Sequence, residues 1–227
     1  KNEIGYKRNG YSTVLTISPS NLSPKIISQR FPQQKKVIDN YDYIGNVLKV
    51  FKDGRIQYVR NGYTNKLISK KLTPKVESFG VLKAGKKVID NYDYLGNVKE
   101  TFEDGRIQYT RDGYSNKLII KSSNLTIKVD NIGKLSPGKT VIDTYDYIGK
   151  IKNLFRDGRI QYVRDGYSNK LITKKLTLKT DKIGELSTGT VVIDNYDYMG
   201  KVLLVFEDGR IQYKRKGYSN KLITKNL

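Results

Sequence analysis

The 227-residue chain contains no cysteine, no histidine and no tryptophan. Without cysteine it forms no disulfide, no thiolate metal site and no cysteine nucleophile. Without histidine it lacks the usual general base and the commonest ligand of transition metals. A chain without cysteine suits a bacterial exported protein, and it suits a cytosolic one as well.

Long apolar segments are also missing from the sequence. No run approaches the roughly 18 consecutive apolar residues that a membrane-spanning helix needs, and we expect no signal peptide within the 227 given residues. The only methionine is Met199. We therefore expect Lys1 to be the start of a processed or excised piece and not a translational start.

Positive charge is the largest excess in the composition. Lysine and arginine number 43 against 22 acidic residues, which gives a formal net charge of +21. A field of this size attracts polyanions such as nucleic acid, teichoic acid, lipopolysaccharide and acidic glycans. Lysine-rich edges also keep β-sheets from pairing with one another, so part of the charge has a purely protective explanation.

The sequence repeats itself. The triplet Val-Ile-Asp starts at Val37, Val88, Val141 and Val192, and a period of roughly 51 residues indicates a repeat architecture. We expect one repeat domain over residues 1–227. Its parts are a partial repeat (1–34), repeat 1 (35–85), repeat 2 (86–138), repeat 3 (139–189) and a truncated repeat 4 (190–227).

Turn dipeptides divide each repeat into strands. Asp53-Gly54 and Asn61-Gly62 predict two-residue hairpin loops, and Gly45-Asn46 predicts a further turn. The runs between them are rich in β-branched and aromatic residues, which favours a four-stranded antiparallel meander. Its strands are expected at about 36–43, 47–52, 55–60 and 63–70. The spacer Lys70–Gly85 is either a fifth strand or an ordered crossover.

These loops fix a register, in which Phe51 faces Ile56, Lys49 faces Tyr58, and Arg60 faces Tyr63. The face expected to be buried carries Val47, Lys49, Phe51, Ile56, Tyr58, Arg60, Tyr63, Asn65 and Leu67. The face expected to be wetted carries Leu48, Val50, Arg55, Gln57, Val59, Thr64, Lys66 and Ile68. Val37, Asp39, Tyr41 and Tyr43 are expected to join the buried face. The core phenylalanines are predicted to be Phe51, Phe102, Phe155 and Phe206.

The fold class is therefore all-β, with over half of the residues in antiparallel strands and almost no helix. A four-stranded meander of about 50 residues has the size of a propeller blade. Two architectures fit: a small β-propeller of four or five blades, and an open array of stacked β-hairpins.

The core of each repeat resembles the YD repeat of Rhs and teneurin-type proteins. The matching residues in the first repeat are Tyr41, Asp42, Gly45, Asn46, Asp53, Gly54, Arg55 and Tyr58. Members of that family form large β-shells on cell surfaces or around toxins. The resemblance covers under half of each repeat, and it implies a surface or secreted scaffold with no catalytic residue.

Candidate binding residues recur once in every repeat. Tyr58, Arg60 and Tyr63 lie side by side in the predicted sheet, and such a trio can stack on a sugar ring or a nucleobase. The alternative is an arginine–tyrosine pair with a structural role. The full set is Tyr58, Arg60, Tyr63, Tyr109, Arg111, Tyr114, Tyr162, Arg164, Tyr167, Tyr213, Arg215 and Tyr218.

Metal binding and catalysis are not predicted. Asp39, Asp42 and Asn46 offer oxygen ligands near a turn, but their spacing lacks the alternation of a calcium loop. The alternative is that Asp42 caps the turn and Asp39 pairs with an arginine. No nucleophile–base pair or phosphate loop is present, and four equal copies argue against one tuned acid–base pair. We expect no enzyme activity, cofactor or metal.

The function that these features favour is multivalent adhesion to anionic glycans or envelope polymers by a secreted or cell-surface module, most simply a bacterial exported protein. The expected partner is an acidic glycan, teichoic acid or lipopolysaccharide. The alternatives are a nucleic-acid-binding protein and a structural subunit of an extracellular fibre or shell that associates with itself.

Overall fold

The computed structural model describes residues 3–8 and 10–225. Strands account for 53% of it, the sheets are antiparallel meanders, and the prediction of an all-β chain is confirmed. The helical elements of the described part are two short 3-10 turns, η1 (Pro19–Asn21) and η2 (Ser122–Asn124). Within the described ranges, no helix has the length and apolar character needed to cross a membrane.

The chain forms two compact units. The first unit contains residues 1–86 and 97–122, and the second contains residues 87–96 and 123–227. The boundary runs through the second copy of the sequence repeat, so the first copy lies in the first unit, and the third and fourth copies lie in the second.

Strands occupy matching positions in the four sequence copies. The first copy has β4 (Lys36–Asp39), β5 (Ile44–Phe51), β6 (Ile56–Arg60), β7 (Lys66–Ser69) and β8 (Leu72–Val76). The second has β11 (Lys87–Asp90), β12 (Leu95–Phe102), β13 (Arg106–Arg111), β14 (Lys117–Lys121) and β15 (Leu125–Val129). The third has β16 (Thr140–Ile142), β17 (Ile148–Phe155), β18 (Ile160–Arg164), β19 (Lys170–Thr173) and β20 (Thr177–Thr180). The fourth has β23 (Val191–Ile193), β24 (Met199–Phe206), β25 (Ile211–Arg215) and β26 (Lys221–Thr224).

The remaining strands are short. Ahead of the first copy lie β1 (Ile4–Lys7), β2 (Val14–Ile17) and β3 (Lys25–Ile26). Small hairpins in the spacers are formed by β9 (Ser78–Phe79) with β10 (Leu82–Lys83), and by β21 (Lys182–Ile183) with β22 (Leu186–Ser187).

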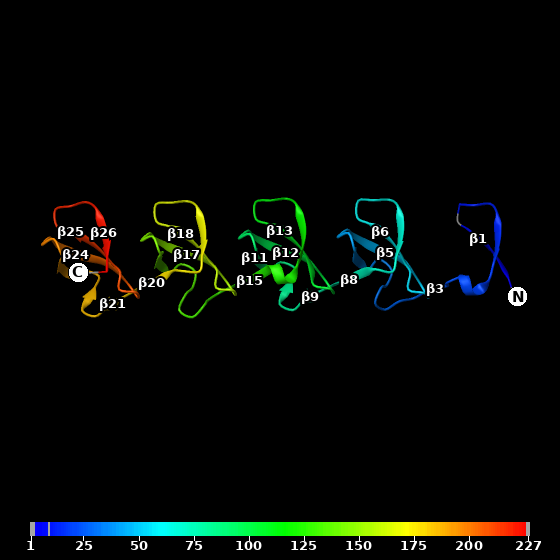
Figure 1. Cartoon of the computed structure of the whole chain (residues 1–227), viewed down its shortest axis with the longest axis horizontal. Helices are drawn as coiled ribbons and strands as arrows, with labels where there is room; N and C mark the ends of the chain where they lie inside the picture. Colours follow the sequence, from blue (N-terminus) through cyan, green and yellow to red (C-terminus); the bar gives the residue numbers. More distant parts are fainter. Residues whose placement is uncertain (1–2, 9, 226–227) are drawn as a thin grey trace. The chain divides into compact units, whose positions relative to one another are not determined.

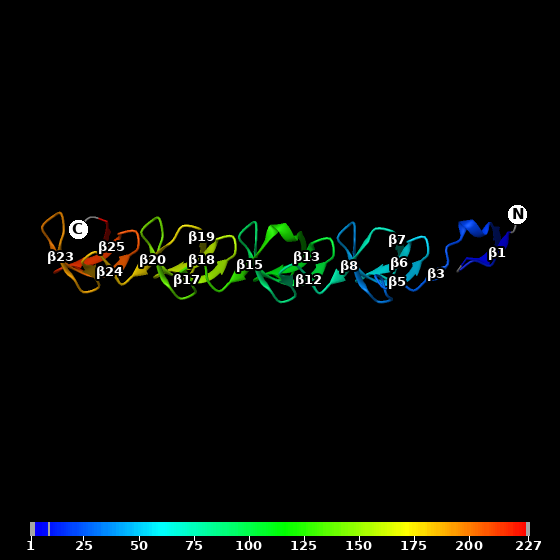
Figure 2. The same ribbon diagram turned by 90° about the horizontal axis from the view of Figure 1, so that it is seen from below.

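Consecutive strands of a copy pair as a meander. In the first copy β5 pairs with β4 and β6, and β6 pairs with β7. In the third copy β17 and β18 lie side by side (Figure 1), and β18 lies between β17 and β19 (Figure 2). Of the two alternatives for the spacer, a fifth strand and an ordered crossover, the structure shows the fifth strand, because residues 72–76 form β8.

The turn after the first strand differs from the prediction. Gly45 and Asn46 do not form a turn but lie inside β5, where a Cβ on Gly45 would come within 2.2 Å of the Val59 carbonyl oxygen. The chain reverses earlier, at Asp42, whose φ of 64° is left-handed. Aspartate tolerates this conformation better than most residues, so the Tyr-Asp-Tyr sequence is itself the turn.

The two hairpin loops are longer than predicted. The Asp53-Gly54 loop has three residues, because the Phe51 N–H donates to the Arg55 carbonyl oxygen and Gly54 adopts a φ of 83°. This is a three-residue loop with glycine in the left-handed position. At Asn61-Gly62 the last strand pair is Val59 with Lys66, so six residues separate the paired positions.

A β-bulge between Val47 and Lys49 then changes the face of the sheet on which the later residues of β5 lie. The predicted partners Phe51–Ile56 and Lys49–Tyr58 are wrong: Val50 pairs with Ile56 and Val47 with Tyr58. An extra residue in one strand reverses the alternation beyond it. As a result Val50 is buried and Lys49 is exposed, opposite to the prediction.

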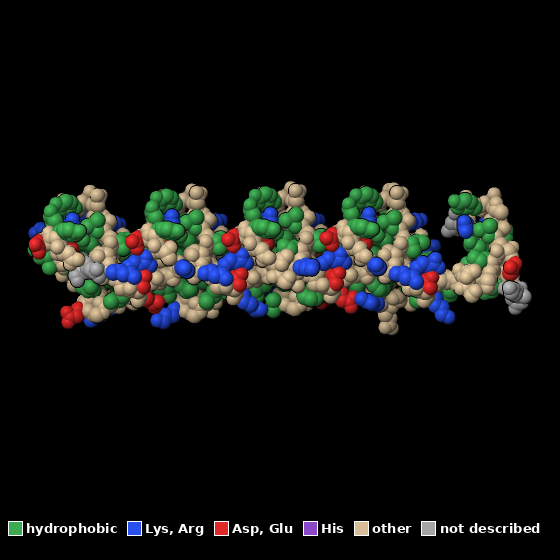
Figure 3. Space-filling view, in the orientation of Figure 1, with side chains coloured by type: hydrophobic (Ala, Val, Ile, Leu, Met, Phe, Trp, Pro, Cys, Tyr) green, Lys and Arg blue, Asp and Glu red, His purple; other side chains and the backbone are tan. Residues whose placement is uncertain are grey.

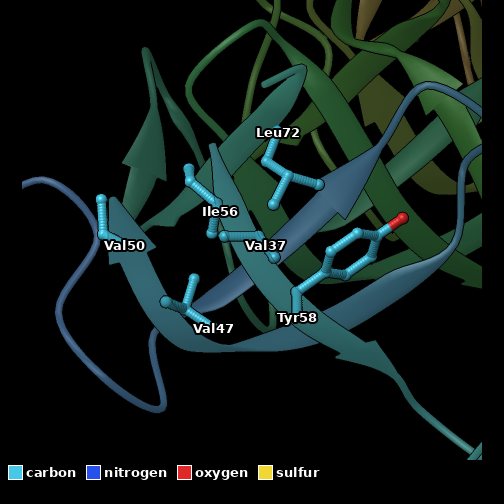
Figure 4. Close-up of a cluster of buried hydrophobic side chains, with 6 residues drawn as sticks. All are labelled: Val37, Val47, Val50, Ile56, Tyr58 and Leu72. Carbon is cyan, nitrogen blue, oxygen red and sulfur yellow. The ribbon is translucent and has the colours of Figure 1, made fainter. Parts of the chain in front are cut away.

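Four members of the first copy's core, Val37, Val47, Ile56 and Tyr58, were expected on the buried face, whereas Lys49, Tyr63 and Asn65 were expected there and are exposed. Figure 4 shows aliphatic side chains from β4, β5, β6 and β8 converging, with the Tyr58 hydroxyl at the edge of the group. Its buried members are Val37, Val47, Val50, Ile56, Tyr58 and Leu72. The predicted burial of Phe102, Phe155 and Phe206 is confirmed, since all three are fully buried. Phe51 is only half-buried.

Candidate functional site

A buried aspartate is the last residue of the first strand, or directly follows it, in each copy, and it organises the following turn. In the first copy Asp39 Oδ1 accepts the backbone N–H groups of Tyr41, at 2.8 Å, and Tyr43, at 3.2 Å. An aspartate that bonds its own backbone a few residues on stabilises a tight turn. The turn therefore holds the two tyrosines in a fixed orientation.

The second carboxylate oxygen of Asp39 receives two side-chain donors from β6. Asp39 Oδ2 accepts the Tyr58 hydroxyl at 2.8 Å and Arg60 Nε at 2.7 Å. Four hydrogen bonds satisfy this buried carboxylate, as burial of a charge requires.

Ionisation in this network follows from burial and hydrogen bonding. Burial alone raises the pKa of Asp39, but the hydrogen bonds from Tyr58, Arg60 and the two backbone N–H groups outweigh it and lower the pKa. Burial and the bond to Asp39 raise the pKa of Tyr58. At neutral pH Asp39 is therefore charged and Tyr58 neutral, and the carboxylate compensates the charge of Arg60.

Exposed tyrosines surround this compensated arginine. The Arg60 guanidinium carbon lies 4.2 Å from the ring centre of Tyr43 and 5.7 Å from that of Tyr41. Tyr63 meets Tyr43 edge to face, with ring centres 6.0 Å apart. We call Tyr41, Tyr43 and Tyr63 the tyrosine cluster. Tyr41 is 77% exposed and Tyr63 is 55% exposed, so the cluster offers ring faces and edges to solvent.

The third copy repeats the arrangement. Asp143 accepts the N–H groups of Tyr145 and Tyr147 at 2.8 and 3.1 Å, and the Tyr162 hydroxyl and Arg164 Nε at 2.6 and 2.8 Å. Arg164 lies 4.1 Å from the Tyr147 ring centre.

The fourth copy does the same. Asp194 accepts the N–H groups of Tyr196 and Tyr198 at 2.9 and 3.2 Å, and the Tyr213 hydroxyl and Arg215 Nε at 2.7 and 2.6 Å. Arg215 lies 4.4 Å from the Tyr198 ring centre, and Tyr198 meets Tyr218 edge to face.

In the second copy Asp90 accepts the N–H groups of Tyr92, at 2.8 Å, and Tyr94, at 3.1 Å. Arg111 Nε donates to the Tyr109 hydroxyl at 3.2 Å. Tyr92 and Tyr114 are both exposed. The second copy thus has the same aspartate turn and the same exposed rings.

The structure divides the predicted binding residues into three kinds. The first tyrosine of each trio is buried and turned to an internal hydrogen bond; these are Tyr58, Tyr109, Tyr162 and Tyr213. The last is exposed; these are Tyr63, Tyr114, Tyr167 and Tyr218. The arginine side chains of the first, third and fourth copies are partly exposed; these are Arg60, Arg164 and Arg215.

Sequence reasoning missed the exposed tyrosine rings of the turn. Tyr41 and Tyr43 were expected on the buried face together with Val37 and Asp39, and the structure buries only Val37 and Asp39. The strand stops at Asp39, so the tyrosines lie in the turn. An aspartate between two tyrosines, in a sequence with a glycine two residues later, was the available signal for a turn.

The candidate metal ligands do not converge. Asp39 is occupied by its four donors, Asp42 Oδ1 accepts Arg106 Nη1 at 2.8 Å, and Asn46 Nδ2 donates to Asn61 Oδ1 at 3.2 Å. In the part of the chain that the structure describes, no group of three or more acidic side chains could hold a metal ion.

Uncompensated positive charge lies on lysines rather than on Arg60. Exposed lysines of the first copy include Lys49, Lys66, Lys70, Lys71 and Lys83. Figure 3 shows groups of hydrophobic side chains with a basic side chain among them, and further basic side chains nearby on the same face. The surface therefore combines neutral aromatic rings with exposed lysine ammonium groups.

The fourth copy also has a hollow beside its tyrosine cluster. A groove of about 750 Å³ is lined by Met199, Leu203 and Tyr218 together with Lys201 and Lys214. Apolar and aromatic walls with a few charged groups are usual in small-ligand sites.

No known family model matches the sequence, and no curated protein matches it.

Proposed function

We propose that the protein is a non-catalytic, secreted or cell-surface adhesion module that binds acidic glycans or anionic envelope polymers at several weak sites. The observation that carries this proposal is the exposed tyrosine cluster of the first copy, with its counterparts in the third and fourth. Exposed lysines are spread over the copies, and the aspartate network holds the rings of each cluster in place.

Stacking is the interaction that the tyrosine cluster offers. Because Asp39 compensates Arg60, the centre of the cluster is nearly neutral and does not act as an anion site by itself. Exposed rings held by a rigid turn bind planar or ring-shaped groups at little cost in side-chain entropy. Stacking of a nucleobase on an aromatic side chain contributes about 1–3 kcal/mol, and one such contact alone gives weak binding.

Lysines supply the attraction for anions. They are spread over each copy instead of converging on one point, which suits a polymer with charges along its length. This term falls as salt rises, because the lysines exchange the polymer for dissolved ions. Linking several weak sites on one polymer raises affinity by a factor of about 10²–10⁴.

The experiment separates stacking from charge. Tyr41, Tyr92, Tyr145 and Tyr196 are replaced by alanine in one variant, and Lys66, Lys117, Lys170 and Lys221 by glutamine in another. Both are titrated at two salt concentrations against polygalacturonate, against polyphosphate, which has no rings, and against single-stranded DNA. A third variant carries phenylalanine at the four tyrosines and serves as the control.

The tyrosine-to-alanine variant should bind polygalacturonate at least tenfold more weakly and polyphosphate unchanged, whereas the phenylalanine variant should behave as wild type. The lysine variant should lose affinity for both. Equal affinity of the tyrosine-to-alanine variant and wild type for polygalacturonate would overturn the stacking role. Tighter binding of DNA than of every glycan would favour the nucleic-acid alternative, which uses the same rings and charge.

Of the two architectures, the open array is the one we favour. In the first unit β8 pairs with β4 of its own copy and also with β12 of the next. In the second unit β20 pairs likewise with β16 and β24. Blades of a propeller are separate four-stranded sheets, whereas here one strand joins two copies by hydrogen bonds.

Hydrogen exchange tests this architecture. The N–H groups of Glu103 and Glu207 donate to Pro74 and Leu178 of the preceding spacer strands, at 3.1 and 3.0 Å. In an open array both amides should be protected. Rapid exchange at both would favour separate blades.

A further inference from the structure

One exposed loop keeps its sequence in all four copies. It joins the third and fourth strands of a copy and reads Gly-Tyr-Thr-Asn-Lys at residues 62–66. Residues 113–117, 166–170 and 217–221 all read Gly-Tyr-Ser-Asn-Lys, so the one change exchanges a hydroxyl side chain for another. Every residue of the four loops is exposed. Packing in a core therefore does not explain why the loop stays the same.

Other exposed positions differ between the copies. The exposed position before each Asp-Gly loop carries either sign of charge: Lys52, Glu103, Arg156 and Glu207. The exposed position directly before the unchanged loop varies as widely: Asn61, Asp112, Asp165 and Lys216. Because exposed neighbours differ while this loop does not, the unchanged sequence indicates a task that all four copies share.

Part of the loop has a structural task. Gly62 adopts a left-handed φ of 83°, which favours glycine, and the Tyr63 ring meets Tyr43. Asn65 and Lys66 have no such task, since their side chains make no hydrogen bond or ion pair with any residue that the structure describes. The same is true of the equivalent pairs Asn116 and Lys117, Asn169 and Lys170, and Asn220 and Lys221. These amide and ammonium groups are therefore open to a ligand.

The backbone holds these groups beside the tyrosine cluster. The Tyr63 N–H donates to the Arg60 carbonyl oxygen at 3.1 Å, and Lys66 pairs with Val59 at the start of β7. The ring centres of Tyr43 and Tyr63 lie 6.0 Å apart. In the third and fourth copies the equivalent ring distances are 6.0 and 5.6 Å. A fixed loop thus presents a hydroxyl, an amide and an ammonium group next to exposed rings.

We infer that this loop makes the tyrosine cluster selective for uronic acids, the sugars whose ring bears a carboxylate. The inference rests on the proposed adhesion to acidic glycans and names the sugar class that the same site binds. In the first copy a tyrosine ring stacks on the sugar, the Asn65 amide bonds to its hydroxyls, and the Lys66 ammonium binds its carboxylate. The other copies use the equivalent residues of their own loops.

The chemistry of these groups fits a uronic acid. An amide is both a donor and an acceptor of hydrogen bonds, as the hydroxyls of a sugar are. Asp39 already compensates Arg60 at 2.7 Å, so Lys66 is the uncompensated cation that the loop offers. A lysine ammonium is a compact point charge, which suits a carboxylate with one negative charge.

A nucleic acid explains the loop less well. Proteins bind single strands of any sequence through stacking and charge, and neither requires an amide at the same place in four copies. A polyuronate presents the same hydroxyls and the same carboxylate on each of its sugars. Identical loops therefore bind the sugars of one polymer equally well, which multivalent adhesion requires.

The experiment compares three variants of the 227-residue chain. The first carries Asn65→Ala, Asn116→Ala, Asn169→Ala and Asn220→Ala. The second carries Lys66→Gln, Lys117→Gln and Lys170→Gln. The third is the matched control, with the same change at exposed lysines outside the loop: Lys49→Gln, Lys99→Gln and Lys152→Gln. All replaced side chains are exposed, so the circular dichroism spectrum and the urea midpoint should match those of wild type.

Each variant is titrated by calorimetry, at about 0.05 M salt, against polygalacturonate, polyacrylate and single-stranded DNA. Polyacrylate has carboxylates but no sugar rings or hydroxyls. The asparagine variant should bind polygalacturonate about tenfold more weakly than wild type, because it loses hydrogen bonds at several sites, and should bind the other two polymers as wild type does. The loop-lysine variant should bind polygalacturonate clearly more weakly than the control lysine variant, whereas the two should bind polyacrylate equally.

Two results would overturn the role of the loop. One is a wild-type affinity of the asparagine variant for polygalacturonate, or an equal loss for polygalacturonate and DNA. The other is an equal loss of polygalacturonate binding in the two lysine variants, since the loop lysines would then act like any other surface charge.

Dextran sulfate separates this inference from the proposed function. A wild-type chain that binds dextran sulfate but not polygalacturonate would overturn the selectivity for uronic acids and leave adhesion to acidic glycans standing. A wild-type chain that binds neither polymer would contradict both.

Discussion

The third and fourth copies place the same strand in two environments. Asp143 and Asp194 accept the same four donors, at distances of 2.6–3.1 Å and 2.6–3.2 Å. Yet Ile142 is buried under β20 and Ile193 is exposed. The turn network is therefore a property of a copy's own residues, whereas the burial of the first strand depends on the neighbouring spacer strand.

Phe51 and Phe155 make the same point at the other end of the copies. Phe155 is fully buried, and its strand pairs with β15 of the preceding spacer. Phe51 is preceded by only part of a copy and is half-buried. The hydrogen bonds of the turn thus recur from copy to copy. The burial of the apolar side chains in a copy varies with the residues that precede or follow that copy.

The largest expected effect concerns these phenylalanines. Phe155→Ala should lower the free energy of unfolding by about 3–5 kcal/mol, the usual cost of removing a fully buried ring. Phe51→Ala should cost clearly less, because part of its surface is already in water. Urea unfolding followed by circular dichroism measures both. Equal costs would mean that a preceding copy adds nothing to the burial of this position.

A somewhat smaller difference is expected between the two isoleucines. Ile142→Ala should cost about 2–5 kcal/mol, and Ile193→Ala less than about 1 kcal/mol, as at other exposed positions. The same unfolding assay provides the comparison. A large cost at Ile193 would reveal cover on β23 in solution.

Removal of the tyrosine hydroxyl that binds the buried aspartate should lower the free energy of unfolding by the same amount in both copies. Tyr162→Phe and Tyr213→Phe each remove one hydrogen bond to a buried carboxylate, worth about 1–3 kcal/mol. If the network is local, the two values should agree within the error of the measurement. A distinctly smaller value for Tyr213→Phe would show that the missing neighbour also loosens the turn.

The smallest effect is a pH dependence that both copies share. For Asp143 and Asp194 burial raises the pKa, and the bonds from tyrosine, backbone and arginine lower it below its usual range. The unfolded carboxyl therefore takes up a proton first. Its stabilising contribution is fully present above about pH 4 and is lost as pH falls through the folded pKa.

The tyrosines give the opposite dependence of stability on pH. Burial raises the pKa of Tyr162 and Tyr213, so their contribution is present below about pH 10 and declines as pH rises toward the folded pKa. Stability measured from pH 2 to 11 should fall at both ends, and Asp143→Asn should flatten the acid side. An unchanged acid side in that variant would exclude this network as its source.

Strand positions and most core residues followed from the sequence because β-branched and aromatic residues alternate there. Ile56 and Tyr58 are buried as predicted. The register did not follow, because a bulge sits at Leu48, where the other copies have Lys99, Lys152 and Leu203. Nothing in these residue types marks a bulge, yet it exchanges the faces of every residue beyond it.

Only part of the candidate site was predicted, because its turn sequences are compatible with more than one conformation. Asp-Gly is compatible with loops of two and of three residues, and Tyr-Asp-Tyr with a strand and with a left-handed turn. At Tyr-Asp-Tyr the turn goes with the hydrogen bonds that Asp39 makes with Tyr58 and Arg60 across the sheet. Those contacts join residues about 20 positions apart, which local patterns do not reveal. The exposed Tyr41 was therefore missed.

The most direct test of the adhesion proposal compares a long and a short ligand on the unaltered protein. Polygalacturonate and its trimer are titrated by isothermal calorimetry at about 0.05 and 0.3 M salt. The proposal predicts that, per binding unit, the polymer binds about 10²–10⁴ times more tightly than the trimer, and that its affinity falls steeply with salt. Equal affinity for polymer and trimer, or binding that does not depend on salt, would contradict it.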